Sequence, residues 1–192
     1  MGPERMEAFS DGVIAIIITI MVLEMKVPHS AGPESLKPLL PVFISYILSF
    51  INIGIYWNNH HHIMHTVHHI NGRVLWANIH LLFWLSLIPF VTAWMGENDF
   101  AKWPVIVYGV VVFMAGVAYY FLSLSLLKIH GKDSTLGLAI GNDRKSILSV
   151  LIYIMGIGAC FIHPLLGVLL YAVVTAMWFI PDNRIEKKLN SG

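Results

Sequence analysis

The amino-acid sequence predicts an all-α integral membrane protein with six transmembrane helices. Of its 192 residues, 57% are hydrophobic and only 12% are charged, whereas about 25% of the residues in soluble domains are charged. The mean hydropathy is +0.71. The apolar residues form long blocks rather than short alternating runs, which favours membrane helices over an outer-membrane barrel. Residues 1–192 are therefore expected to form a single six-helix transmembrane domain.

The first four spans are apolar blocks of the length that a hydrocarbon layer of about 30 Å requires. They are predicted at residues 6–26, 39–60, 74–95 and 104–127. Glu4, Glu7 and Asp11 precede the first block, and no small-residue cleavage site follows it. We therefore expect this block to remain in the protein as a helix rather than to be removed as a signal peptide.

The last two spans are predicted from one apolar stretch, residues 147–180, that is too long for a single crossing. As one helix it would measure about 50 Å. Because a proline disfavours helical backbone at the residue before it, Pro164 predicts a break at His163. Two short helices, at residues 146–162 and 164–180, are the expected result.

The distribution of lysine and arginine predicts that both termini lie in the cytoplasm. With the N-terminus inside, nine of these residues fall in inner segments and three in outer segments, as the positive-inside rule requires. We expect a multi-pass protein of the cytoplasmic membrane. The inner residues are Arg5, Arg73, Lys128, Lys132, Arg144, Lys145, Arg184, Lys187 and Lys188, and the outer ones are Lys26, Lys37 and Lys102.

The charge balance and the short connections exclude several functions. The formal net charge is +1 and there is no basic stripe, so nucleic acid is not expected as a partner. No connecting segment exceeds about twenty residues, which leaves no room for an extramembrane catalytic domain. No recognisable catalytic motif accompanies the polar residues. We therefore expect neither an enzyme nor a bound cofactor.

Two acidic residues, Asp11 and Glu24, lie too close together for both to be outside the hydrocarbon layer. Twelve uncharged residues separate them, so their Cα atoms are about 20 Å apart along a helix. At least one carboxylate is then expected at hydrocarbon depth. An acidic residue at that depth indicates a functional site. The alternative is a short first helix with thinned lipid around it.

One face of the first helix collects large aliphatic residues. At 100° per residue, a stripe about 100° wide contains Gly12, Ile16, Thr19, Ile20 and Leu23. Asp11 lies about 140° from Ile16 and is therefore better placed to pair with a neighbouring helix. Ordinary packing between helices would also explain such a stripe.

The predicted topology brings polar residues of three helices together at the cytoplasmic side. An unpaired Asp11 is costly at this depth, and imidazoles or Arg5 are its available partners. We expect a buried network that fixes how the three helices meet, with a direct proton or ion relay as the alternative. The residues concerned are Arg5, Ser10, Asp11, His60, His61 and Asn78, with Trp57 and His80 at similar depth.

The histidines between residues 60 and 69 include the spacing of metal ligands. One helix face is shared by His61, His65 and His68, and another by His62, His65 and His69. No cysteine supports either set, and the nearest candidate carboxylates are remote in sequence. We therefore favour a membrane-surface helix, whose imidazole groups would be partly protonated at a pH of about 6.5, over a zinc site. We expect no bound metal.

The residues Arg5-Met-Glu-Ala-Phe9-Ser10-Asp11 follow the pattern Arg-x-x-x-Phe-Ser-Asp at the start of a membrane helix. This pattern resembles the signature of the transmembrane protein 175 family of potassium channels, in particular its bacterial single-repeat members. Trp57-Asn-Asn-His60-His61, Asn78 and Pro89-Phe90 resemble further positions of that family.

The resemblance implies a homotetramer in which the first helix of each subunit lines one central pore. The pore would be constricted by Ile16, Ile20 and Leu23, and Thr19 corresponds to a pore-facing hydroxyl that is associated with potassium preference. The resemblance also implies an interhelical network of Arg5, Ser10, Asp11, a second-helix histidine (His60 or His61) and Asn78.

The expected selectivity is modest. No Thr-Val-Gly-Tyr-Gly filter occurs in the sequence, so a cage of carbonyl groups cannot supply it. A hydrophobic constriction discriminates weakly, through the cost of removing hydration, which is lower for K⁺ than for Na⁺. We expect a channel for K⁺ and, less readily, other monovalent cations. The alternative is a histidine-dependent divalent-metal or proton-coupled transporter.

Overall fold

The computed structural model describes residues 2–131, 134, 137 and 144–179, and every regular element in this part of the chain is a helix. Lys132, Arg184, Lys187 and Lys188 of the charge count, and the end of the predicted sixth span at Ile180, lie outside the described residues. The helices are α1 (Glu4–Leu23), the 3-10 helix η1 (Pro33–Leu39), α2 (Leu40–His65), α3 (Gly72–Ser86), α4 (Ile88–Glu97), α5 (Lys102–His130), α7 (Arg144–Ala159) and α8 (Pro164–Phe179).

Four helical segments are long and apolar enough to cross a membrane, and they coincide with the first four predicted spans. α7 and α8 occupy the remaining two, and the interruption between them confirms the predicted break before Pro164. Each of these helices has 16 residues, or about 24 Å. Six helical segments therefore fit the prediction, and the described parts of the last two are shorter than a layer of about 30 Å.

The third predicted span is interrupted, which the sequence prediction did not anticipate. Pro89 has no N–H group, and its ring would collide with the Leu85 carbonyl in a regular helix. α3 therefore ends at Ser86, and the Leu87 N–H bonds to the Trp84 carbonyl, three residues back, at 3.3 Å. α4 begins at Ile88 and completes the crossing.

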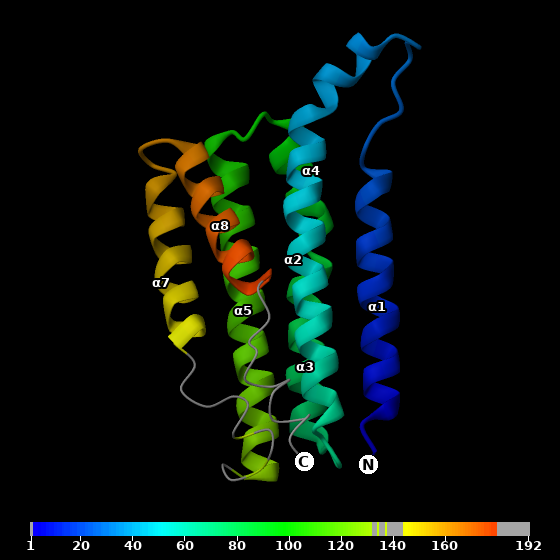
Figure 1. Ribbon diagram of the computed structural model, residues 1–192, viewed down its shortest axis with the longest axis vertical. Coiled ribbons are helices and arrows are strands. Elements are labelled where there is room, and N and C mark those ends of the chain that lie inside the picture. Colours follow the sequence, from blue (N-terminus) through cyan, green and yellow to red (C-terminus); the bar gives the residue numbers. More distant parts are fainter. Residues whose placement is uncertain (1, 132–133, 135–136, 138–143, 180–192) are drawn as a thin grey trace.

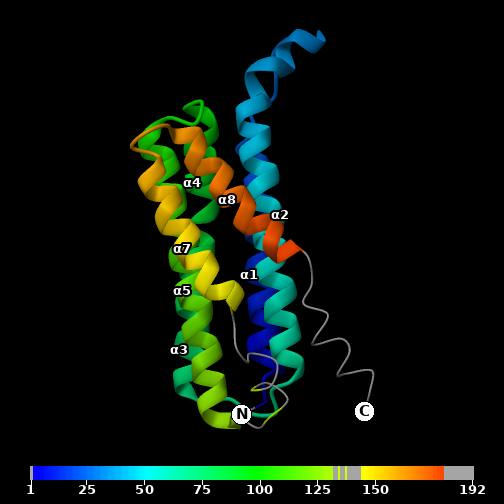
Figure 2. The same cartoon turned by 60° about the vertical axis from the view of Figure 1, so that its left-hand side comes forward.

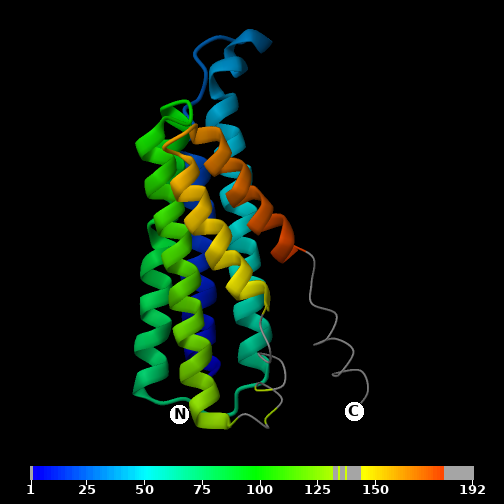
Figure 3. The ribbon, with the colours of Figure 1, turned by 90° about the vertical axis from the view of Figure 1, so that its left-hand side faces the viewer.

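The long helices run side by side, and α1 lies at one edge of the bundle (Figure 1). The start of α1, the end of α2 and the start of α3 share the lower end in this view, which we call the N-terminal end of the bundle. α7 lies beside α5, and α8 crosses α2 at an angle (Figures 2 and 3). α1 packs on α2, α3 and α4, so part of its surface remains uncovered.

The two ends of α1 are held differently. At the far end, the segment that follows α1 is tied to α4 by Lys26, whose Nζ lies 2.8 Å from Glu97 Oε1. This hydrogen bond raises the pKa of the Lys26 ammonium group. Both side chains are exposed, and exposed ion pairs contribute little to stability. The buried hydrogen bonds that join α1 to its neighbours lie nearer its N-terminus, as described below.

Candidate functional site

One long face of α1 is exposed in the part of the chain that the structure describes. The buried face of the helix holds Met6, Ser10, Ile14, Ile17 and Met21. On the other side, large apolar side chains are exposed, namely Phe9 (60%), Ile16 (58%), Ile20 (40%) and Leu23 (78%). The stripe of Ile16, Ile20 and Leu23 therefore lies outside the core formed by the described residues.

Small residues follow one edge of this uncovered face. Ala8, Gly12, Ala15 and Thr19 are all exposed, and a Cβ atom added at Gly12 would have no described atom within 4 Å beyond its chain neighbours and the nearby backbone of its own helix. At 100° per residue, these four positions lie about 40–100° to one side of Ile16. Because small residues let membrane helices approach closely, this edge is suited to contact with a helix from outside the subunit.

Thr19 presents an oxygen atom on the same face. Its Oγ1 lies 3.0 Å from both the Ala15 and the Ile16 carbonyl oxygens. The hydroxyl proton is therefore engaged with the backbone, whereas the lone pairs of the oxygen remain available. The exposed Thr19 side chain can in this way offer an acceptor to a cation.

Ser10 on α1, Asn78 on α3 and His60 on α2 form a buried chain of hydrogen bonds. Asn78 Nδ2 donates to Ser10 Oγ at 2.8 Å, and Asn78 Oδ1 lies 2.9 Å from His60 Nε2. Because the amide oxygen only accepts, His60 must carry its proton on Nε2. All three side chains are at most 1% exposed. The structure thus joins three of the predicted network residues, one from each helix.

The direction of this chain favours a structural role over a proton relay. Ser10 Oγ donates to the Met6 carbonyl at 2.8 Å, and a carbonyl oxygen accepts a hydrogen bond without passing a proton on. At the other end, His60 Nδ1 has no hydrogen-bond partner within the described residues. This series of hydrogen bonds therefore has no onward path for a proton at either end. It holds three helices in register.

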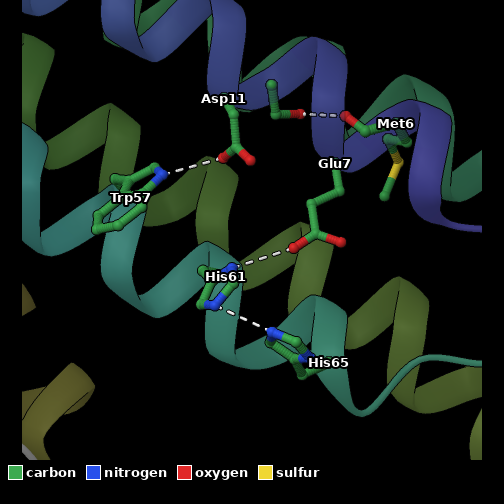
Figure 4. Close-up of polar contacts among 7 residues, drawn as sticks. Met6, Glu7, Asp11, Trp57, His61 and His65 are labelled. Carbon is green, nitrogen blue, oxygen red and sulfur yellow. Dashed lines mark hydrogen bonds and ion pairs between the residues drawn. The ribbon is translucent and has the colours of Figure 1, made fainter.

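Asp11 pairs with Trp57, so the expectation of an imidazole or Arg5 partner is wrong. Trp57 Nε1 donates to Asp11 Oδ1 at 3.0 Å (Figure 4). Asp11 lies one turn after Glu7 on α1, and Trp57 lies one turn before His61 on α2. The antiparallel register of the two helices places Asp11 beside Trp57 and Glu7 beside His61.

Arg5 does not join the predicted network. It is exposed, and within the described residues it makes no ion pair or side-chain hydrogen bond with Asp11 or any other group. The reason is geometric, because five residues along a helix separate Arg5 from Ser10 by about 140°. Arg5 instead lies within about 20° of Ile16, on the uncovered face of α1.

The histidines that lie together in the structure are not the sets that the sequence predicted. α2 ends at His65, so His68 and His69 do not continue its faces. His61 Nδ1 lies 3.1 Å from Glu7 Oε1, and His61 Nε2 lies 3.0 Å from His65 Nε2 (Figure 4). His61 also stacks on Trp57, with ring centroids 5.9 Å apart. The fold therefore brings a carboxylate to two histidines from which it is remote in sequence.

A second buried polar cluster, at mid-height of the bundle, was not predicted. The Ser49 and Thr92 hydroxyls lie 2.6 Å apart, and Ser49 donates to the Tyr108 hydroxyl at 3.1 Å. Asn52 Nδ2 also donates to Thr175 Oγ1 at 3.3 Å. A usable signal was present, because Ser45, Ser49 and Asn52 recur every three or four residues along an otherwise apolar helix.

The comparisons with known proteins agree with this architecture. Residues 5–89 match the model of the family described as the endosomal/lysosomal potassium channel TMEM175. A protein of Chryseobacterium sp. (strain P1-3) that is named a potassium channel is 51% identical over 189 residues, which cover 98% of each chain. The chain belongs to the TMEM175 family. The family resemblance found in the sequence is thereby confirmed.

Two further relatives of this TMEM175 protein cover less sequence or are less similar. A protein of Streptomyces collinus that is named a potassium channel is 39% identical over 97 residues, or 48% of this chain and 47% of that protein. The crystal structure of a lysosomal potassium-selective channel TMEM175 homolog from Chamaesiphon minutus matches with a TM-score of 0.78 and 29% identity, covering 91% of this chain and 95% of that one. The family consists of ion channels, not enzymes.

Proposed function

We propose that this TMEM175 protein is a potassium-permeable cation channel in which four copies surround a central pore lined by α1. The observation that carries the proposal is the uncovered face of α1, where Ile16, Thr19, Ile20 and Leu23 lie together and are exposed among the described residues. The relative that is named a potassium channel and matches over 98% of each chain supports K⁺ as the permeant ion. The subunit number rests on the family resemblance.

Exposure alone does not decide between a pore and lipid, because lipid tails are as apolar as isoleucine. Two features of the uncovered face favour contact with other subunits. Its small-residue edge at Ala8, Gly12, Ala15 and Thr19 permits close helix approach. Arg5 also shares this face, and a charged side chain is costly in lipid but not beside a water-filled vestibule.

The chemistry of the face suits a weakly selective gate. A ring of Ile16, Ile20 and Leu23 side chains narrows the pore and gates it by dewetting. A ring of Thr19 hydroxyls, each with its proton held by the backbone, replaces part of the hydration shell of an ion. Removing hydration costs less for K⁺ than for Na⁺, so K⁺ passes preferentially and other monovalent cations pass less readily.

The charge distribution supports an orientation for this channel. The excess of lysine and arginine in alternate connections favours both termini in the cytoplasm, with the protein in the cytoplasmic membrane. On this orientation, the network of Ser10, Asn78 and His60 lies near the cytoplasmic side. It anchors α1 while the opposite face of the same helix lines the pore.

A transporter that depends on its histidines is the alternative to a channel. His62, His65, His68 and His69 lie at the N-terminal end of the bundle and not on the uncovered face of α1. Replacing all four should therefore leave K⁺ flux intact if the protein is a channel. Loss of flux in this variant, with the oligomer still assembled, would support the transporter.

The proposal is tested by K⁺ flux into liposomes that contain the purified protein. Replacing Ile16 or Leu23 by Asn should wet the constriction, so that K⁺ flux rises and Na⁺ flux approaches it. Ile154→Asn on α7 is a matched control, because Ile154 is as exposed as Ile16 (56% against 58%) but lies on another helix. Unchanged fluxes in both pore variants would contradict the assigned pore face.

A further inference from the structure

The cluster of Glu7, His61 and His65 lies on the side of α1 that faces α2 and is not part of the proposed pore lining. The ligand atoms that its three side chains can offer all lie within 4.8 Å of one another. Two of these residues belong to α2 and one to α1, which means that the cluster spans a helix interface. Figure 4 shows the three side chains converging from the two helices.

We propose that Glu7, His61 and His65 form a site for a divalent transition metal, with Zn²⁺ as the representative ion. The Nε2 atoms of His61 and His65 are the ligands, and Glu7 orients His61 by accepting a hydrogen bond from its Nδ1–H. Water completes the coordination on the exposed side of His65. The proposal does not depend on the function proposed above.

The positions of the two imidazoles fit a metal closely. Tetrahedral zinc with Zn–N bonds of about 2.0–2.1 Å holds its ligand atoms about 3.3 Å apart. The two Nε2 atoms are 3.0 Å apart in the protein, so a shift of a few tenths of an ångström accommodates the ion. Residues four apart on a helix lie on one face, and the His61 and His65 rings are perpendicular, with centroids 4.3 Å apart.

Glu7 supplies what an isolated pair of histidines lacks. A ligating histidine usually gives its other ring N–H to a carboxylate, which fixes the tautomer and makes the ligating nitrogen more basic. Here Glu7 Oε1 lies 3.1 Å from His61 Nδ1, which leaves Nε2 directed at His65. Stacking on Trp57 further restrains the His61 ring. The negative charge of Glu7 also partly offsets the charge of a divalent ion.

Metal binding at this site would couple α1 to α2. The ion is held by two residues of α2, and it strengthens the hydrogen bond that His61 donates to Glu7 on α1. By linkage, an ion that prefers the associated helices stabilises that association by the same free energy. The protein should consequently unfold at a higher temperature with Zn²⁺ than without it.

The test is calorimetric titration of Zn²⁺ into the full-length protein, purified in detergent through a tag that contains no histidine. His65→Ala should lower the affinity of one site per chain by at least about 100-fold, and Glu7→Gln by about 10–100-fold, as changes to an orienting carboxylate do. His65 is exposed, so its replacement leaves the packing intact. His62→Ala is the matched control from the same helix and should change the affinity less than about threefold.

Two further measurements separate the site from background binding by the other histidines. Cu²⁺ bound to the wild type should give electron paramagnetic resonance couplings to two imidazole nitrogens, and His65→Ala should remove one of them. The rise in unfolding temperature with Zn²⁺ should be smaller in Glu7→Gln than in His62→Ala. Equal Zn²⁺ affinities of the His65→Ala and His62→Ala variants, or a Cu²⁺ spectrum that His65→Ala does not change, would overturn the proposal.

Discussion

At the scale of single residues, two hydroxyl groups of α1 lie in different surroundings. Ser10 is fully buried and tied to α3, whereas Thr19 is exposed and tied only to its own backbone. The difference follows from helix periodicity, because nine residues separate the two positions by about 180°. A hydroxyl on the buried side joins helices, and a hydroxyl on the uncovered side is available to an ion.

Thr19 provides a direct test of this assignment. Thr19→Val keeps the shape of the side chain and removes the hydroxyl, so the K⁺ over Na⁺ permeability ratio should fall about two- to fivefold. This range corresponds to the net value of one hydrogen bond, about 0.5–1 kcal/mol. Reversal potentials under bi-ionic conditions measure the ratio. Thr19→Ser retains the hydroxyl and should stay near the wild type, and a Thr19→Val channel with undiminished selectivity would refute the role of Thr19.

At the scale of elements, α1 is held by one face and left free on the other. The chain through Asn78 ties it to α2 and α3 deep in the bundle, and the Trp57 indole adds a second tie at Asp11. Hydrophobic burial does not drive helix association in a bilayer, so such polar ties and close packing carry the specificity. The anchored face fixes the rotation of α1 and thereby the direction of Ile16.

Removing the shared partner in this network should destabilise the protein. Asn78→Ala leaves the buried His60 Nε2–H without an acceptor and removes the donor to Ser10 Oγ, which should lower the free energy of unfolding by about 1–3 kcal/mol. Unfolding in mixed micelles with increasing sodium dodecyl sulfate measures the change. Asn58 on α2 is exposed, so Asn58→Ala should remain within about 0.5 kcal/mol of the wild type. Equal stabilities of the two variants would show that the hydrogen bonds through Asn78 do not anchor α1.

At the scale of the whole molecule, the subunit is a bundle with one conspicuous asymmetry. α5 supplies the largest share of the buried core, whereas α1 lies at the edge and α7 and α8 cover only part of the opposite side. A pore cannot pass through the packed interior, since its centre is filled by side chains such as Tyr108, Leu81 and Ile53. An ion path on the uncovered face of α1 therefore requires further copies of the chain to enclose it.

The assembly is tested by native mass measurement in detergent. The wild type should appear at four times the chain mass of 21.6 kDa. Gly12→Leu should greatly reduce this species, because Gly12 has open space beside it among the described residues but a larger side chain there would separate adjoining copies of α1. Gly158 on α7 is also exposed and free of neighbours, so Gly158→Leu is the control. A stable Gly12→Leu tetramer would contradict the proposed interface.

Much of the fold could be predicted from local patterns. Long apolar blocks predict helices that cross a membrane, Pro164 predicts the break between α7 and α8, and the 100° step places Ile16, Ile20 and Leu23 on one face. The same 100° step also separates Arg5 from Ser10 by about 140° around the helix. The interruption at Leu87 also had a local signal in Pro89.

The sequence by itself determined the membrane class, the helical segments and which residues of α1 share a face, because these depend on hydropathy and on the fixed geometry of a helix. Only the tertiary structure decided that Asp11 meets Trp57, that Glu7 meets His61 and that Ser10 reaches Asn78. These partners lie 46, 54 and 68 residues apart. Their meeting depends on the register and rotation of packed helices, which no local pattern encodes.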